Sequence, residues 1–148
     1  MAKLKHYSAD APRSLSDILL YEIDPRYSRE HGELAPVAEK VPMGAVLAQN
    51  GGGQYVPFGA ELSPAVEAVE ASEGVDAVEG KDAVLADKPA AILISRDIEP
   101  SEEAQECAVI RRGACVAACN LSWLSAVSDD QKKTALAALA SLGIVPKE

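Results

Sequence analysis

The chain has 148 residues, of which 48% are hydrophobic, 25% are charged and only 4% are aromatic, and its formal net charge is −9. Leu, Ile, Val and Phe make up about 24% of it, above the roughly 20% below which disorder is the expectation. The acidic balance argues against a nucleic-acid backbone or an anionic membrane as partner, and no apolar run approaches the roughly 18 residues of a membrane span. Residues 1–5 are not followed by the apolar stretch of a secretory signal. We therefore expect one soluble, acidic domain that is made inside the cell.

The N-terminal segment, residues 1–34, is predicted to form an arm. Pro12, Pro25 and scattered charges surround a single apolar run over residues 15–23. This run is too short to fold alone and needs a partner surface. The partner is either the domain itself or another protein, and the sequence leaves both alternatives open.

A first β-hairpin is predicted where the compact part of the chain begins. Residues 43–48 and 54–57 are typical of strands, and Asn50 with three following glycines forms a turn signal, because glycine tolerates positive φ. No Gly-Lys-Ser/Thr follows these glycines, which excludes a phosphate-binding P-loop. Pro57 marks a sheet edge or the end of a strand.

Most of the net charge lies in residues 61–88, which contain eight acidic and two basic residues. Within this segment, residues 66–74 are followed by a similar nine-residue stretch over 75–83. Gly74 and Gly80 interrupt any helix there. We predict a solvated insertion. The alternative, a Ca²⁺-binding loop, is disfavoured because Val and Ala separate the acids differently from an EF-hand.

The second half of the chain begins with a predicted buried strand over residues 90–95. A polar connection at 101–104 leads to two apolar segments, 107–110 and 114–119. Between these segments lies Arg111-Arg112-Gly113, which predicts a second hairpin with the two arginines at a solvated tip.

A C-terminal helix is the clearest predicted element. Ser128 is a suitable N-cap with Gln131 three residues later, which is the pattern of a capping box. Three leucines follow at every third position from Leu136. Gly143 occupies the position of a C′ glycine, and Pro146 prevents the helix from continuing. We expect a structural, amphipathic helix.

Three cysteines and two histidines do not form a metal-binding pattern. Cys107, Cys115 and Cys119 have the spacing Cys-x₇-Cys-x₃-Cys, with His6 and His31 far upstream. Cys107 could reach Cys115 across the predicted hairpin, but the odd number and the lack of a secretory signal favour free thiols. No nucleophile has a neighbouring base, and no hydrolase motif is present. We predict no catalytic, cofactor-binding or metal site, and an interaction protein in place of an enzyme.

Several segments, taken in order, resemble the lambda-type head decoration (capsid cement) proteins of tailed bacteriophages. The N-terminal pattern is Leu19-Leu20-Tyr21-Glu22 followed by Ser28-Arg29, and the hairpin at 43–57 comes next. The C-terminal half adds Val109-Ile110-Arg111 to Gly113, Asn120-Leu121 with Trp123, and Gln131-Lys132-Lys133 leading to Leu142-Gly143-Ile144. No single motif is diagnostic, so the resemblance depends on the ordered set.

The resemblance implies an α+β fold, a small mixed β-rich domain that is β-tulip-like, with hairpins, a C-terminal helix and an extended N-terminal arm. We divide the chain into a capsid-binding arm, 1–34, and a decoration domain, 35–148, with the acidic insertion at 61–88. The resemblance assigns capsid binding to residues of the arm: Ile18, Leu19, Leu20, Tyr21, Glu22, Ile23, Ser28 and Arg29.

The function that the resemblance implies is decoration of a viral capsid. Such proteins bind as trimers to the outer surface of the expanded head and cement neighbouring major capsid protein subunits. The implied partners are the major capsid protein and a homotrimer of the chain itself, with no nucleic acid, no membrane and no cofactor. The implied location is the virion, after synthesis in the host cytoplasm. The alternative is a soluble, non-viral, β-rich adaptor domain that docks through its N-terminal apolar segment.

Overall fold

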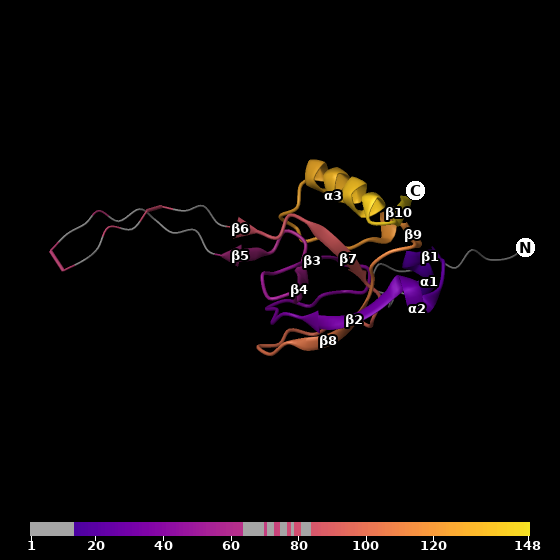
Figure 1. Cartoon of the computed structure of the whole chain (residues 1–148), viewed down its shortest axis with the longest axis horizontal. Coiled ribbons are helices and arrows are strands. Elements are labelled where there is room, and N and C mark those ends of the chain that lie inside the picture. The colour runs from indigo at the N-terminus through magenta and orange to yellow at the C-terminus, as the bar shows by residue number, and fades with distance from the viewer. Residues whose placement is uncertain (1–13, 64–69, 71–72, 75–76, 78, 81–83) are drawn as a thin grey trace, which may run out of the picture.

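A computed structural model describes residues 14–63, 70, 73–74, 77, 79–80 and 84–148. Within these residues, ten strands form three sheets and one long helix lies near the C-terminus (Figure 1). The predicted class, a small α+β domain rich in β-structure, is confirmed. The repeat predicted over residues 66–83 falls mostly outside the described residues.

Five strands close into a barrel. In barrel order they are β2 (Arg29–Leu34), β4 (Tyr55–Pro57), β3 (Val46–Gln49), β7 (Pro89–Leu93) and β8 (Gln105–Ile110). The longest pairing joins β2 and β8, which run antiparallel from Arg29 opposite Ile110 to Leu34 opposite Gln105. One buried cluster fills the barrel, with side chains that include Leu34, Leu47, Tyr55, Leu93 and Val109.

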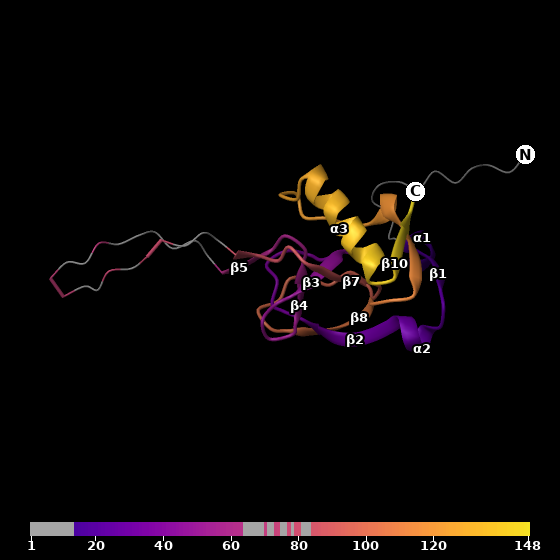
Figure 2. The same cartoon turned by 45° about the horizontal axis from the view of Figure 1, so that its top comes forward.

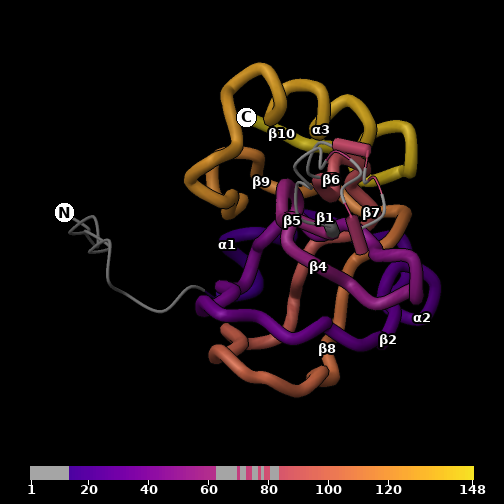
Figure 3. The backbone as a smooth tube through the Cα atoms, turned by 90° about the vertical axis from the view of Figure 1, so that its left-hand side faces the viewer, coloured from indigo at the N-terminus to yellow at the C-terminus, as the bar shows by residue number. Residues whose placement is uncertain are grey.

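A second sheet lies beside the barrel, with strand order β1 (Leu19–Glu22), β9 (Ala114–Ala117) and β10 (Ile144–Lys147). β1 is antiparallel to β9, and β10 is parallel to it. Helix α3 (Asp129–Ser141) packs against β10 and β7, and Figure 3 shows it running across one side of the strands. Residues of both sheets and of α3 share one core cluster, which includes Ile18, Ile92, Ile110, Val116, Leu139 and Ile144.

The predicted N-terminal cap of α3 is confirmed. The Ser128 hydroxyl accepts from the backbone N–H of Gln131 at 3.3 Å, and the Gln131 side chain accepts from the backbone N–H of Ser128 at 2.8 Å. These reciprocal bonds satisfy two backbone donors that the first turn of a helix leaves without partners. No helix among the described residues is long and apolar enough to cross a membrane.

The predicted leucine face of α3 is only partly correct. Leu139 is fully buried, whereas Leu142 is 46% exposed. A spacing of three residues moves around a helix of 3.6 residues per turn, so three such positions cannot all face the core equally. Gly143 has φ +88, as a C′ glycine requires, and the chain then enters β10, where Pro146 lies in an edge strand.

The first predicted hairpin is confirmed. β3 and β4 pair antiparallel, and Pro57 is the last residue of β4. The Asn50 side-chain oxygen accepts from the backbone N–H groups of Gly52 and Gln54, both at 3.0 Å. The short polar side chain thus closes the turn that the three glycines make sterically possible.

The second predicted hairpin is wrong. β8 pairs with β2 and β7, and β9 pairs with β1 and β10, so residues 111–113 carry the chain from the barrel to the second sheet. Two apolar strands that are adjacent in sequence have each found more distant partners. The predicted strand over 114–119 is also too long, because η1 (Ala118–Asn120) follows β9.

All three cysteines are free thiols, as the sequence favoured. Cys107 lies in β8 and Cys115 in β9, so they do not face each other across a hairpin. Burial raises the pKa of the Cys107 thiol to about 11. This thiol is therefore protonated at neutral pH, when it packs as a small apolar side chain and is not a nucleophile.

Residues 14–34 pack against the rest of the domain. They form α1 (Leu15–Ile18), β1, α2 (Pro25–Ser28) and β2. The N-terminal apolar run packs in cis through Leu15, Ile18 and Leu19, whereas other apolar residues of the run remain exposed. The described part of the chain shows no break in packing at residue 34, because β2 completes the barrel together with later strands.

The ends of the acidic insertion form a short ribbon, which we call the stem. Its strands are β5 (Glu61–Ser63) and β6 (Val84–Leu85), which pair antiparallel. The N–H of Gly59 donates to the carbonyl of Ala86 at 2.7 Å, and this bond continues the pairing of the two chain segments at the base of the stem. Figures 1 and 2 show the stem at the opposite end of the molecule from α1, α2 and β1.

Candidate functional site

Four large apolar side chains are exposed on β1, on α2 and in the short connection between them. The exposed fractions are 53% for Leu20, 61% for Tyr21, 64% for Ile23 and 53% for Tyr27. We call this region the β1–α2 surface. Single exposed apolar residues are ordinary on proteins, but a group on neighbouring elements is typical of an interaction site.

The backbone of β1 is also open to a partner. Among the described strands β1 pairs only with β9, so it forms one edge of its sheet. Its register shifts between Leu19 and Tyr21, which places an irregularity in the edge strand. An edge strand presents N–H and C=O groups to which an additional strand can bind.

Helix α2 is a single turn, and residues at its N-terminus determine where it begins. Asp24 is the N-cap, and its carboxylate accepts from the backbone N–H of Arg26 at 2.7 Å. Pro25 occupies the first helical position, where its missing N–H costs nothing. The turn ends at Ser28, and it presents Tyr27 to solvent.

Gly113 anchors the β1–α2 surface to the domain. Its carbonyl accepts from the backbone N–H of Ile23 at 2.8 Å and from the Ser28 hydroxyl at 3.0 Å. A Cβ at this position would lie 3.0 to 3.2 Å from atoms of Tyr27, Ile23 and Ser28, and φ is +59. A side chain here would crowd these atoms and strain the backbone, so the position favours glycine.

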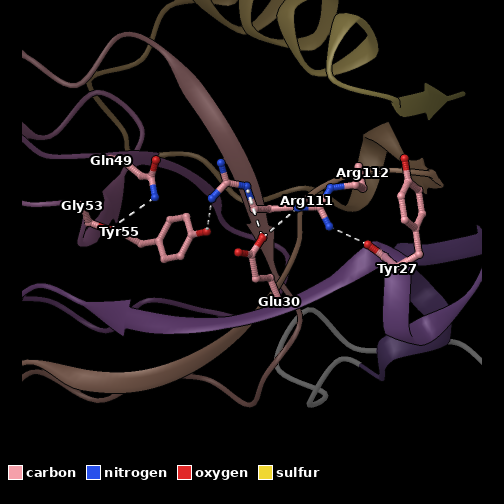
Figure 4. A network of polar contacts seen from close by, with 7 residues as sticks. All are labelled: Tyr27, Glu30, Gln49, Gly53, Tyr55, Arg111 and Arg112. Carbon is pink, nitrogen blue, oxygen red and sulfur yellow. Dashed lines mark hydrogen bonds and ion pairs between the residues drawn. The ribbon is translucent and has the colours of Figure 1, made fainter.

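The two arginines before Gly113 are engaged with this surface (Figure 4), so the predicted solvated tip is wrong. Arg112 donates to the Tyr27 carbonyl at 2.6 Å and to the Glu30 carboxylate at 3.1 Å. Its guanidinium lies 5.4 Å from the centroid of the Tyr27 ring. Arg111 lies 3.5 Å from the same Glu30 oxygen and donates to the Tyr55 hydroxyl at 3.1 Å. The fork of donors on each guanidinium is what lets one turn connect α2, β2 and β4.

The structure separates the predicted capsid-binding residues into two groups. Ile18 and Ser28 are fully buried, and Leu19 is partly buried. Arg29 binds Glu22 through two hydrogen bonds of 2.9 and 2.6 Å. Hydrogen bonding to Glu22 raises the pKa of Arg29 above its ordinary value. These five residues position the surface, whereas Leu20, Tyr21 and Ile23 are the predicted residues that it exposes.

Two residues of this region were missed by sequence reasoning. Tyr27 lies directly before the Ser-Arg pair of the N-terminal pattern. The sequence therefore pointed to the adjacent residues, but it did not predict that Tyr27 is exposed. Arg112 was assigned to a solvated turn because its partners, Tyr27 and Glu30, are distant in the sequence. Among the described residues, no group of three or more His, Cys, Asp and Glu side chains could hold a metal ion.

The protein-family model described as Bacteriophage lambda head decoration protein D matches residues 8–144. The chain belongs to this family. The resemblance inferred from the ordered motifs is thereby confirmed, and a role in decorating the phage head follows from it. Members of a head decoration family are structural components of the virion capsid, which favours this role over that of a non-viral adaptor. No curated protein matches the chain.

Proposed function

We propose that this decoration protein binds the outer surface of the expanded head as trimers and cements neighbouring major capsid protein subunits. The capsid contact is assigned to residues 1–34, with the β1–α2 surface as its described part. The exposure of Leu20, Tyr21 and Ile23 beside the open edge of β1 is the observation that carries this proposal.

An edge strand with exposed apolar side chains suits binding by strand addition. A segment of the capsid protein would form backbone hydrogen bonds with β1, while its surface covers the side chains of Leu20 and Ile23. Each large apolar side chain that becomes fully buried contributes about 1.5–3 kcal/mol. Because Gly113 and the two arginines hold α2 in place, little conformational entropy is lost when the partner binds.

Trimerisation increases the avidity for the capsid when each single contact is weak. Three copies joined around one axis present three β1–α2 surfaces, and the first bound surface raises the effective concentration of the other two. Neighbouring capsid subunits bound by one trimer are thereby held together. A local threefold axis of the shell can supply the geometry even for a protein that is monomeric in solution.

Point substitutions test the proposal better than deletion of the arm, because residues 14–34 contribute β1, β2 and part of the core. The test variant is Leu20→Ser with Ile23→Ser, and the control is Val145→Ser, an exposed apolar residue of β10. We expect the double variant to bind expanded capsids about tenfold or more weakly in co-sedimentation, because two apolar contacts are lost. Equal capsid occupancy for the double variant and the control would contradict the assignment of this surface.

Electron microscopy of decorated capsids tests the trimer independently. Three copies around each local threefold axis of the outer surface are expected. Density for isolated copies at other positions would contradict trimeric cementing, whichever surface of the protein makes the contact.

A further inference from the structure

A pocket of about 280 Å³ lies between the end of β3, the start of β7, the residue that follows β8 and the residue that follows α3. Its lining consists of Gln49, Lys88, Pro89, Ala90, Arg111 and Leu142. Two of these residues are cationic and none is acidic. The other polar residue, Gln49, offers an amide.

The charge of this pocket is not neutralised by the described residues around it. Lys88 is exposed and forms no ion pair with any of them. Arg111 shares the Glu30 carboxylate with Arg112, so two guanidinium groups have one carboxylate between them. An excess of positive charge therefore remains at the pocket, where it attracts an anionic group.

The arginine of the pocket is held ready for a ligand. Its guanidinium donates to the hydroxyl of Tyr55, which is itself buried in the barrel, and it lies against Glu30 (Figure 4). A guanidinium fixed in this way loses little freedom when it binds a carboxylate. Beside it, Pro89, Ala90 and Leu142 form an apolar wall. The pocket thus suits a carboxylate that is flanked by small aliphatic side chains.

One segment of this chain has that chemistry. Residues 64–83 contain six acidic residues and one lysine, and the acids alternate with Val and Ala, as in Val66-Glu67-Ala68-Val69-Glu70. We propose that the pocket binds a carboxylate of residues 64–83 from a second copy of this protein. The acidic insertion would then link neighbouring copies, through charge complementarity and a small apolar contact.

Such a link is a head-to-tail contact, in which one copy supplies the insertion and the next supplies the pocket. The inference rests on the proposed decoration role only to bring copies side by side, where their local concentration is high. The binding itself is measurable without a capsid, so its failure is distinguishable from failure of capsid binding.

The test uses the full chain and a synthetic peptide of residues 64–83, titrated at low ionic strength and followed by calorimetry. We expect Lys88→Glu to weaken peptide binding about tenfold, because an attractive charge becomes a repulsive one. Lys133→Glu is the matched control, since it makes the same charge change on the exposed side of α3, away from the pocket. The control should bind the peptide within about twofold of the unmodified chain.

One further peptide and two changes of solution conditions complete the test. A peptide with all its acids replaced by amides should not bind, and added salt should weaken binding of the acidic peptide. The inference is overturned if the acidic peptide does not bind the unmodified chain, or if both lysine variants lose binding equally. It is also overturned if acetate, added beforehand at the same carboxylate concentration as the peptide, abolishes the heat of peptide binding.

Discussion

Residues 14–34 and the stem make an instructive pair, because sequence reasoning placed both outside the compact body. The first segment contributes β1 to one sheet and β2 to the barrel, with Ile18, Ser28 and Leu34 fully buried. The stem contributes only a ribbon of two short strands, whose exposed residues include Leu62, Val84 and Leu85. Charged residues are present in both segments, so charge alone does not distinguish an integrated segment from a projecting one.

The difference comes from the partners that each segment finds. β1 pairs with one edge of β9, and β2 pairs with one edge of β8. Without β1 and β2, these two edges would have no strand partner. Among the described strands, β5 and β6 pair only with each other, and a two-stranded ribbon gains little stability by itself. A segment joins the core when a distant part of the chain offers it an unfilled edge and an apolar surface.

The largest expected effect tests whether the N-terminal segment belongs to the core. Ile18→Ala removes a fully buried side chain from the cluster shared by both sheets, and we expect a loss of about 3 kcal/mol in the free energy of unfolding. Urea denaturation measures it. Leu20→Ala, two residues later and exposed, should cost less than about 0.5 kcal/mol. Similar losses for the two variants would show that residues 15–23 do not pack as described.

The next effect concerns the anchor of this segment. Gly113→Ala forces a Cβ against Tyr27, Ile23 and Ser28 at positive φ, and we expect a loss of about 2 kcal/mol by urea denaturation. Gly51→Ala is the control, because nothing lies within 4 Å of its Cβ and its φ is not positive. A loss at Gly113 no larger than at Gly51 would mean that the turn adjusts freely and anchors nothing.

A smaller effect is expected for the arginine network. Glu30→Gln leaves Arg111 and Arg112 without their shared carboxylate, but all three side chains are partly exposed. We therefore expect a loss of about 0.5–1 kcal/mol, which decreases as salt is added. Glu103→Gln, an exposed acid with no described side-chain partner, should be neutral at every salt concentration. A loss at Glu30 that does not depend on salt would argue against an ionic origin.

The smallest expected effect concerns the stem. Val84→Ser with Leu85→Ser removes exposed apolar groups from the stem, and the change in unfolding free energy should stay within about 0.5 kcal/mol. Thermal unfolding provides the measurement. A loss above about 1 kcal/mol in the free energy of unfolding would show that the stem contributes to the stability of the core, as residues 14–34 do.

The candidate site was only partly predictable. Leu20, Tyr21 and Ile23 were identified from an apolar run and are exposed, whereas Ile18 belongs to the same run and is buried. The apolar run alone does not predict which of its residues face the core. Within the run, α1 ends and an irregular edge strand begins, so the side chains do not follow a single periodicity. Tyr27 depends on a cap and a turn that carry no hydrophobic periodicity, and this is why it was missed.

The sequence by itself determined the features that depend on neighbouring residues: the Ser128–Gln131 capping box, the turn after Asn50, the apolar strand near Ile92 and the ordered motifs of the decoration family. Only the tertiary structure decided which strands pair, so that β8 and β9 separate at Gly113 and the N-terminal segment enters both sheets. The physical reason is that caps and turns are satisfied by hydrogen bonds within a few residues. Strand partners, in contrast, are selected by the burial of surfaces that lie far apart in the chain, and no single segment contains that information.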